Sequence, residues 1–555
     1  MKEIISIQVG GYANFVGSHF WNLQDEVLGR KDDEESSCFP DNGINFDVLY
    51  RVGETRQGLE TYTPRLVAID ARGSLGAVKV AGSLYDNPSS TDTTLLFSWK
   101  GKLSKHVSEP EIKNEFLQSL EQEELDWVTS QQTSTSRDLK EKSSSVESRD
   151  EHKILQNLED TVQYWTDYSK VHFHPLSLFE LDGVWHGTTP FDDYGNGRDI
   201  LSGYMKDDAL DRVRFFVEEA DHMQGLQVLV DDSNGFAAVS DEFLEAVHDE
   251  YDKSPILLFT AHPPPLRSPA TLFESVVRRI HDAVSFSAIV SSSSSVIPFS
   301  LSSFAKLSRY LQVNDAKNFH TSAVYASAMS CMTLPLRMDL SEAHSVAIDK
   351  VCGAMDMGDL IYVLSGRLGR RVSASEIAMP APLIPGIERT EPLDSSWFES
   401  LIQDIIKTDD QVASEAVVVQ GALSADSKLP APIHDVVNCF PRKDKQFFQL
   451  SASPCPLAVP LPFPDIFGPA KQSKAWISDF TSISVATKLS TSISVLPYLE
   501  ERVLSFQNPG GSSLGWQVLE GWGLQKDDVK ELCEEMSNVV SAYRDKSWDS
   551  ASDSE

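Results

Sequence analysis

The spacing of apolar residues near the amino terminus predicts a strand followed by a helix. Residues 3–10 form a short, mostly apolar run, which is typical of a buried strand. Gly10 and Gly11 then mark a turn, and residues 14–27 place apolar side chains at helical spacing. A strand, a glycine turn and a helix in this order are typical of the start of a doubly wound α/β sheet.

The same alternation returns further along the chain. A second buried strand is predicted at residues 65–70, and it ends at Asp70. A helix over 207–223, a strand over 225–230, a helix over 236–251 and a strand over 255–260 then form a βαβ unit. Ligands of open α/β sheets bind at the carboxyl ends of the strands. We therefore expect Asp70 and the segment after residue 230 to lie at the candidate site.

Two regions interrupt or follow this pattern. Residues 110–127 predict a helix whose apolar stripe packs on the body or binds a partner, and residues 129–152 are Ser-rich with few apolar residues, which predicts a disordered insert. Beyond residue 345 we expect a divergent α+β domain. Its repeated Thr-Ser-Ile-Ser-Val segments at 481–485 and 491–495 predict two similar strands. The predicted organisation is an N-terminal domain over 1–345, a second domain over 346–545 with a helix at 525–543, and an acidic tail over 546–555.

Charge and cysteine content narrow the function classes. The chain has 555 residues and a formal net charge of -34, which disfavours nucleic acid as a partner. Its six cysteines are scattered without a C-x-x-C pair, so no metal site is expected. No apolar run reaches the ~18 residues that cross a bilayer, and no targeting leader is recognisable. We expect a cytoplasmic protein with no transmembrane segment.

The opening of the chain resembles tubulin. The match extends to residues 64–70, 223–230 and 326–337, and the insert and the variant loop at 231–237 resemble the Misato family, a divergent eukaryotic tubulin-like group. The resemblance implies a tubulin-like, Rossmann-type doubly wound nucleotide-domain fold, then the divergent α+β domain and a C-terminal helix. The residues at tubulin spacing are Glu3, Ile7, Gly10, Gly17 and Trp21, and those shared with the β type are Gln8, Asn14 and Phe20.

The resemblance also indicates where a nucleotide would bind. The tubulin phosphate loop is Gly-Gly-Gly-Thr-Gly-Ser-Gly, whereas this chain has Asp231-Asp-Ser-Asn-Gly-Phe-Ala. Two carboxylates repel a triphosphate, and bulky side chains keep the backbone away from it. We predict a degenerate nucleotide site without catalytic residues, and we expect no cofactor, GTP being the one considered. The site residues are Gly10, Gly11, Asn14, Gly17, Asp70, Asp231, Asp232, Ser233, Asn234 and Gly235.

The acidic pair in this loop has two other interpretations. Asp232 or Ser233 would cap the helix that follows Asn234, because short polar side chains accept hydrogen bonds from the first helical N–H groups. Alternatively, Asp231 and Asp232 would hold a cation that recruits phosphate.

The resemblance implies a non-enzymatic scaffold or adaptor in mitochondrial distribution, morphology and inheritance. Its expected partners are proteins, among them tubulin or the chaperones that fold it, and its expected contact with mitochondria is peripheral, on the outer surface. Two alternatives stay open, a GTP-binding cytoskeletal protein and a cofactor of tubulin folding and microtubule assembly. Whether the loop at 231–237 can hold phosphate discriminates the GTP-binding alternative from the others.

Overall fold

The structure is a computed structural model. It describes residues 2–30, 43–54, 60–80, 111–132, 154, 157–305, 307, 310–338, 352–384, 397–403, 405, 412–424, 431–440, 447–468, 481–507 and 513–544. The predicted domain boundary near residue 345, the insert from residue 133 onward and the acidic tail lie outside these residues.

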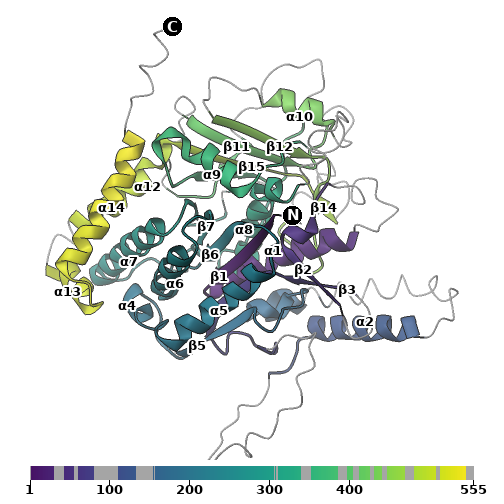
Figure 1. The fold of residues 1–555 in the computed structure, drawn as a ribbon, viewed down its shortest axis with the longest axis horizontal. Helices are drawn as coiled ribbons and strands as arrows, with labels where there is room; N and C mark the ends of the chain where they lie inside the picture. The colour runs from purple at the N-terminus through teal and green to yellow at the C-terminus, as the bar shows by residue number, and fades with distance from the viewer. Residues whose placement is uncertain are drawn as a thin grey trace, which may run out of the picture.

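A six-stranded parallel sheet organises the N-terminal part, in the order β5-β4-β1-β6-β7-β8. Apart from the exposed end of the edge strand β5, its strands are buried on both faces, as expected when helices cover a parallel sheet on each side (Figure 1). The predicted doubly wound α/β fold is therefore confirmed. The strands are β1 (Glu3–Val9), β4 (Leu66–Arg72), β5 (Leu178–Trp185), β6 (Met223–Val230), β7 (Ile256–Ala261) and β8 (Ser295–Phe299).

Alternate residues along each strand face different helices. One face packs against α1 and α8, and the other packs against α5, α6 and α7. The covering helices are α1 (Gly11–Gly29), α5 (Tyr204–Glu219), α6 (Phe236–Glu250), α7 (Leu272–Ser291) and α8 (Asn318–Met332), and α4 (Tyr194–Gly197) is a short helix beside α6. These positions bring the β1–α1 and β6–α6 turns to the same edge of the sheet, next to the carboxyl end of β4.

A second, mixed sheet follows in the order β10-β9-β15-β11-β12. The helix α8 lies between the two sheets, and the Cys331 thiol faces the carbonyl oxygens of Val418 and Val485 at 3.7 and 3.8 Å. The elements of this region are α9 (Met357–Ser365), β9 (Ala374–Ala378), β10 (Glu399–Ser400), β11 (Val412–Gln420), α10 (Ile433–Cys439), β12 (Phe447–Ser453), β13 (Leu457–Ala458), β14 (Ser482–Ile483) and β15 (Val485–Ser492). This α+β region matches the predicted second fold.

One strand prediction here is wrong. The first Thr-Ser-Ile-Ser-Val copy enters β14 and the start of β15, but the second copy begins at the end of β15 and turns into a 3-10 helix, Ile493–Val495. The turn leads into α12, so the two copies of this short repeat adopt different structures because their surroundings differ.

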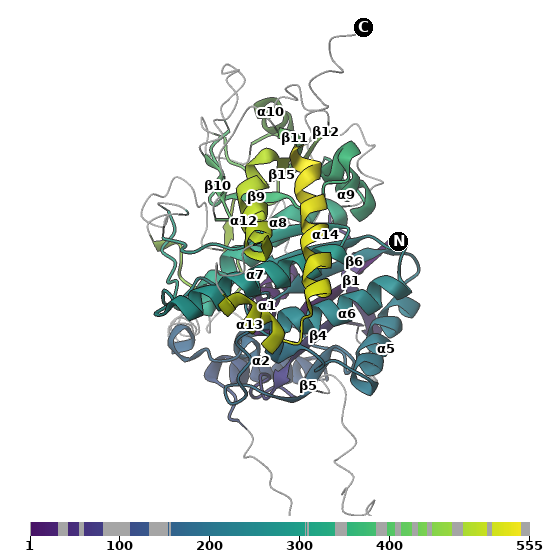
Figure 2. The same ribbon diagram turned by 90° about the vertical axis from the view of Figure 1, so that its left-hand side faces the viewer.

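Three C-terminal helices return to the N-terminal part. Two of them, α12 (Leu496–Gln507) and α14 (Lys526–Arg544), run side by side, and with α13 (Ser513–Gly521) they pack against α7 (Figure 2). The Tyr543 hydroxyl is also hydrogen-bonded to the main chain of Val372. The predicted C-terminal helix is confirmed, and it joins the regions before and after residue 345.

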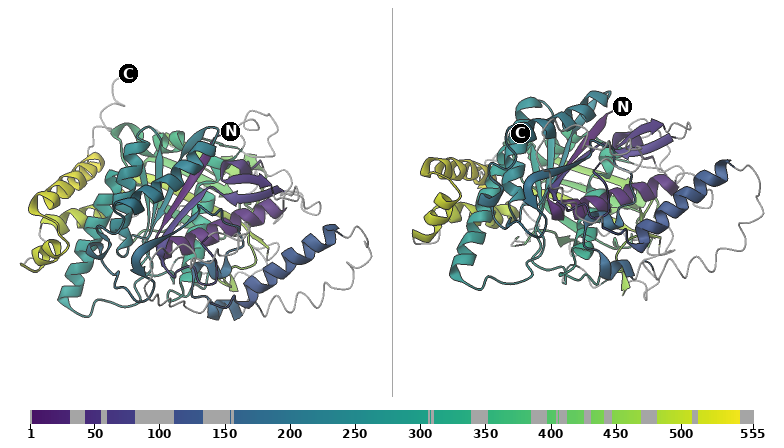
Figure 3. Two further views of the ribbon diagram at one scale, coloured as in Figure 1. Left: turned by 60° about the horizontal axis from the view of Figure 1, so that its bottom comes forward. Right: turned by 90° about the horizontal axis from the view of Figure 1, so that it is seen from below.

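At the opposite end of the molecule lie α2 (Glu115–Gln132) and the hairpin of β2 (Tyr50–Glu54) and β3 (Glu60–Pro64) (Figure 3). The helix α2 extends to Gln132, so residues 129–132 are helical and not part of a disordered insert, because a helix continues locally once it is nucleated. Among the described residues, no helix is long and apolar enough to cross a membrane.

Candidate functional site

All the predicted site residues except Gly17 lie at the carboxyl edge of the six-stranded sheet. Gly10 follows β1 and caps α1 at φ 101°, and a Cβ placed there would lie 2.6 Å from Cβ of Asp231, so only glycine allows this approach. The amide of Asn14 reaches Asp70 across the same edge, with 2.9 Å between Nδ2 and Oδ2. Gly11 lies at the first position of α1, with open space around it.

Gly17 does not belong to this edge. It lies inside α1, where a Cβ would come within 2.2 Å of the Gln8 side chain on β1. Its role is therefore close packing of the helix against the strand. The tubulin-like spacing therefore marks a position that requires glycine. This glycine is needed for the packing of the fold, and it does not line the candidate site.

The Asp231 carboxylate lies at the amino end of α1. It accepts a hydrogen bond from the backbone N–H of Tyr12 at 3.0 Å, and it is almost fully buried. The same carboxylate accepts hydrogen bonds from the Ser233 hydroxyl at 2.6 Å and from the Asn234 amide at 3.0 Å. The first turn of a helix presents free N–H groups and partial positive charge, which suit an anion. Here the chain's own carboxylate occupies that place.

Several N–H groups of the 231–237 loop are used within the protein. Ser233 N–H donates to Asp231 at 3.2 Å, and Phe236 N–H donates to the Asn234 side chain at 2.9 Å. Gly235 N–H donates to the Phe191 carbonyl at 3.0 Å, and a Cβ on Gly235 would come within 2.9 Å of the Phe191 ring. These N–H groups would be the donors to a bound phosphate, and the Phe191 ring covers the approach to Gly235.

These contacts correct one prediction about the helix cap. The N-cap of α6 is Gly235, which has no side chain to cap the helix, and the side chain that accepts from the first helical N–H is that of Asn234, not that of Asp232 or Ser233. Asp231 and Asp232 have separate hydrogen-bond partners, since the first binds Tyr12 N–H and the second binds His262. Within the described part of the chain, no group of three or more His, Cys, Asp or Glu residues is arranged to hold a metal ion.

The Asp70 carboxylate is likewise buried and hydrogen-bonded by groups of the protein itself. Its carboxylate accepts hydrogen bonds from the Trp165 indole N–H at 2.9 Å and from Ala71 N–H at 2.7 Å, in addition to Asn14. Burial raises the pKa of Asp70 to about 6, although these three donors oppose the shift. Nothing in the sequence pattern marked Trp165 or Phe191, because each reaches the site from a segment that has no regular spacing.

A second group of polar side chains adjoins the first. The His262 imidazole, directly after β7, lies 3.1 Å from the Asp232 carboxylate. Burial opposes protonation of His262, but the hydrogen bond and the charge of Asp232 raise its pKa to about 9. His281 on α7 donates to the Asp232 carbonyl at 2.8 Å and accepts a hydrogen bond from Tyr194 N–H. Together these contacts tie the ends of β6 and β7 to α7, and the sequence analysis did not predict either histidine.

A pocket of about 640 Å³ opens beside His262. Its walls are the three prolines after His262, the first turns of α7 and the start of α8. Such a volume is typical of small-ligand or side-chain pockets. The lining residues are Asp192, Ser233, His262, Pro263, Pro264, Pro265, Leu266, Arg267, Ser268, Pro269, Phe273, Glu274, Val277, Arg278, His281, Asp282 and Asn318.

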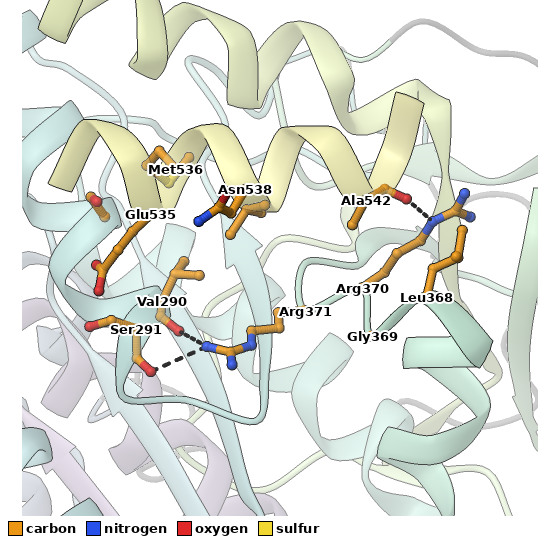
Figure 4. Close-up of a pocket in the computed structure, with 12 residues that line it drawn as sticks. Val290, Ser291, Leu368, Gly369, Arg370, Arg371, Glu535, Met536, Asn538 and Ala542 are labelled. Carbon is orange, nitrogen blue, oxygen red and sulfur yellow. Dashed lines mark hydrogen bonds between the residues drawn. The ribbon is translucent and has the colours of Figure 1, made fainter. Parts of the chain in front are cut away.

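A second pocket, of about 440 Å³, separates α14 from the end of α7 (Figure 4). The Arg371 guanidinium donates to the carbonyls of Val290 and Ser291 at 3.5 and 3.3 Å, and Arg370 donates to the Ala542 carbonyl at 3.0 Å. Cations at a helix C-terminus stabilise its free carbonyls. The two arginines therefore hold α7 and α14 in place.

Comparisons with known proteins agree with this architecture. Residues 2–122 match the Misato Segment II tubulin-like domain, and residues 155–338 match the Tubulin domain. The chain is 29% identical to mouse protein misato homolog 1 over 98% of both chains, and 30% identical to the human homologue over 69% of this chain and 66% of that one. It is also 30% identical to protein dml-1 of Neurospora crassa over 61% of this chain and 57% of that one. The chain belongs to the Misato family of tubulin-like proteins.

Proposed function

We propose that this protein is a non-enzymatic scaffold with a degenerate nucleotide site. The observation that supports this most directly is the hydrogen bond from Tyr12 N–H to the Asp231 carboxylate. A nucleotide phosphate at the same helix end would displace this carboxylate or lie beside it, and two anions in a buried site repel each other strongly. The aromatic side chains of Trp165 and Phe191 add a steric barrier.

The cellular part of the proposal rests on the Misato resemblance. We propose a role in mitochondrial distribution, morphology and inheritance, performed from the cytoplasm and at the outer surface of mitochondria. The proposed partners are proteins, with tubulin and its folding chaperones as the first to test. The competing function is that of a GTP-binding cytoskeletal protein, which the same site would have to support.

Calorimetry with GTP and Mg²⁺ tests the scaffold against the GTP-binding alternative. At a protein concentration of roughly 50 μM we expect no saturable heat up to millimolar GTP, a range that detects weak binding. We also expect no rise in melting temperature at millimolar GTP, since a ligand that binds the folded state stabilises it.

The contrary result is saturable GTP binding that Gly10→Trp abolishes. The indole would fill the space between Gly10 and Asp231, where even a Cβ is only 2.6 Å from Cβ of Asp231. Such a result would identify the 231–237 loop as a working phosphate site and would support the cytoskeletal alternative.

A further inference from the structure

The segment between β7 and α7 is unusually accessible. Residues 265–273 form the longest run of consecutively exposed residues in the part of the chain that the structure describes. No backbone–backbone hydrogen bond among the described residues involves residues 263–269. The prolines at 263–265 and at 269 favour an extended chain, because the proline ring fixes φ. The segment is therefore exposed, extended and not part of a helix or sheet.

Both ends of this segment are held by the fold. His262 N–H donates to the Phe299 carbonyl at 2.8 Å, and Thr271 caps α7 by accepting from Glu274 N–H at 3.1 Å. Residues 265–273 contain two hydroxyl side chains, those of Ser268 and Thr271. Since Thr271 is used as the helix cap, Ser268 is the hydroxyl of this run that a modifying enzyme can reach without disturbing α7.

The residue after Ser268 narrows the class of enzyme. A residue that precedes proline is restricted to extended conformations, and Ser268 precedes Pro269. A protein kinase must bring the substrate hydroxyl to its catalytic Asp, and an extended, accessible segment allows this. Because Pro269 has no backbone N–H, the segment suits kinases that need no hydrogen bond from the residue after the serine. Proline-directed serine/threonine kinases form this class.

The fold discriminates Ser268 from the other hydroxyl residues that precede a proline. The sequence contains five such pairs, beginning at Thr63, Thr189, Ser254, Ser268 and Ser453. Thr63 and Ser453 are only 1% and 2% exposed. Thr189 and Ser254 are partly buried, and each is held in a turn by a hydrogen bond to a residue three or four positions earlier. Ser268 is the exposed member of the set.

We propose that Ser268 is a phosphorylation site for a proline-directed protein kinase. In this step the Ser268 Oγ attacks the γ-phosphorus of ATP, the bond from that phosphorus to the β-phosphate oxygen breaks, and ADP leaves. The hydroxyl proton passes to the catalytic carboxylate of the kinase. The product is a phosphoserine that carries about −1.5 to −2 elementary charges at neutral pH.

The phosphate would change the character of the surface around it. Leu266, Leu272 and Phe273 are 79%, 73% and 51% exposed and lie within five residues of Ser268. A phosphate among these apolar side chains opposes their burial in a contact, because a charge without a partner is costly to remove from water. The inference goes beyond the proposed scaffold role, since it depends on the accessibility of one segment and not on the nucleotide site.

Phosphate transfer to the full-length protein tests the proposal. The protein is incubated with ATP and a purified mitogen-activated protein kinase, which is proline-directed, and the modified residue is located by fragment-ion mass spectrometry. We expect phosphate on Ser268 and its loss in Ser268→Ala. The matched control is Ser254→Ala, which removes a partly buried Ser-Pro pair and should leave the incorporation unchanged. Circular dichroism checks that both variants are folded.

Synthetic peptides separate the effect of the sequence from that of the fold. Peptides of residues 249–259, 263–273 and 448–458 present the three Ser-Pro pairs without the rest of the chain. We expect the kinase to phosphorylate all three peptides but only Ser268 of the folded protein, because the fold restricts access to the other two serines.

Three results would overturn the proposal. The first is no phosphate on the folded protein although the 263–273 peptide is phosphorylated, which would show that the segment is not accessible. The second is failure of the 263–273 peptide itself, which would show that the kinase class does not recognise this sequence. The third is incorporation that Ser268→Ala leaves unchanged. None of these measurements involves GTP, so their failure is separate from failure of the nucleotide-site proposal.

Discussion

At the scale of single residues, the contact between Asp232 and His262 links protonation to stability. Burial alone would raise the pKa of Asp232, but His262 lowers it, and Asp232 in turn raises the pKa of His262 from 6.5 to about 9. A histidine whose pKa is raised on folding stabilises the folded state fully below its unfolded pKa. That contribution is lost as the pH rises through the folded pKa.

The first prediction concerns this pH dependence. Between pH 6.5 and about 9 the free energy of unfolding should fall by ~2–3 kcal/mol through His262 alone. In the variant His262→Gln the free energy of unfolding should no longer fall over this pH range, as measured by urea unfolding at several pH values. The control His248→Gln changes an exposed histidine on α6, and this variant should keep the pH dependence of the free energy of unfolding. An unchanged slope in His262→Gln would show that the pair does not form in solution.

At the scale of elements, the amino end of α1 is hydrogen-bonded by a residue from the β6–α6 turn. Asp231, after β6, accepts the Tyr12 N–H of α1 and the side-chain donors of Ser233 and Asn234. Removing one partner leaves buried donors without hydrogen bonds, and each such donor costs about 1–3 kcal/mol. The loop and the helix are therefore coupled through one carboxylate.

We predict that Asp231→Ala lowers the free energy of unfolding by ~2–3 kcal/mol, less than the sum of the lost bonds because a buried charge is also removed. The exposed Asp192→Ala should change it by less than ~0.5 kcal/mol. Chemical denaturation of both variants provides the comparison. If Asp231→Ala were as stable as the native chain, the hydrogen bond from Tyr12 N–H of α1 to the Asp231 carboxylate would not contribute to stability.

At the scale of the whole molecule, α8 and the C-terminal helices pack against both the N-terminal part and the second sheet region and so connect them. The core that covers one face of the parallel sheet also contains Val418, Val485 and Leu489 of the second sheet. The helix α14 returns to contact α7 and Val372. A scaffold needs a fixed geometry between distant surfaces, and shared cores of this kind provide it.

The proposed peripheral contact with mitochondria is a prediction at this scale. In cell fractions, we expect part of the protein to sediment with mitochondria, to be released by alkaline carbonate and to be degraded by protease added to intact mitochondria. These outcomes follow from attachment through surface contacts, which high pH disrupts. Resistance to carbonate, or protection from protease, would contradict attachment to the outer surface.

The sequence by itself predicted four strands of the first sheet, β1, β4, β6 and β7, and the helices α1, α5 and α6 that connect and cover them; it did not predict β5, β8, α7 or α8. Gly10, with its positive φ, and the run from β6 to β7 appear where apolar spacing placed them, because those patterns depend on neighbours along the chain. The loop at 231–237 could also be recognised as acidic and poor in glycine. The end of α2 and the second tandem segment were predicted wrongly, because composition alone does not decide where a helix stops or a strand turns.

Only the tertiary structure decided what the candidate site residues contact. The pairing of Asp231 with Tyr12 spans 219 positions, and Trp165 reaches Asp70 across 95. The tertiary structure also left Gly235 as the N-cap of α6, with the Asn234 side chain accepting from Phe236 N–H, since Asp232 is directed to His262. Such contacts depend on how whole elements pack, and side-chain chemistry at one position does not encode the distance to a partner far along the chain.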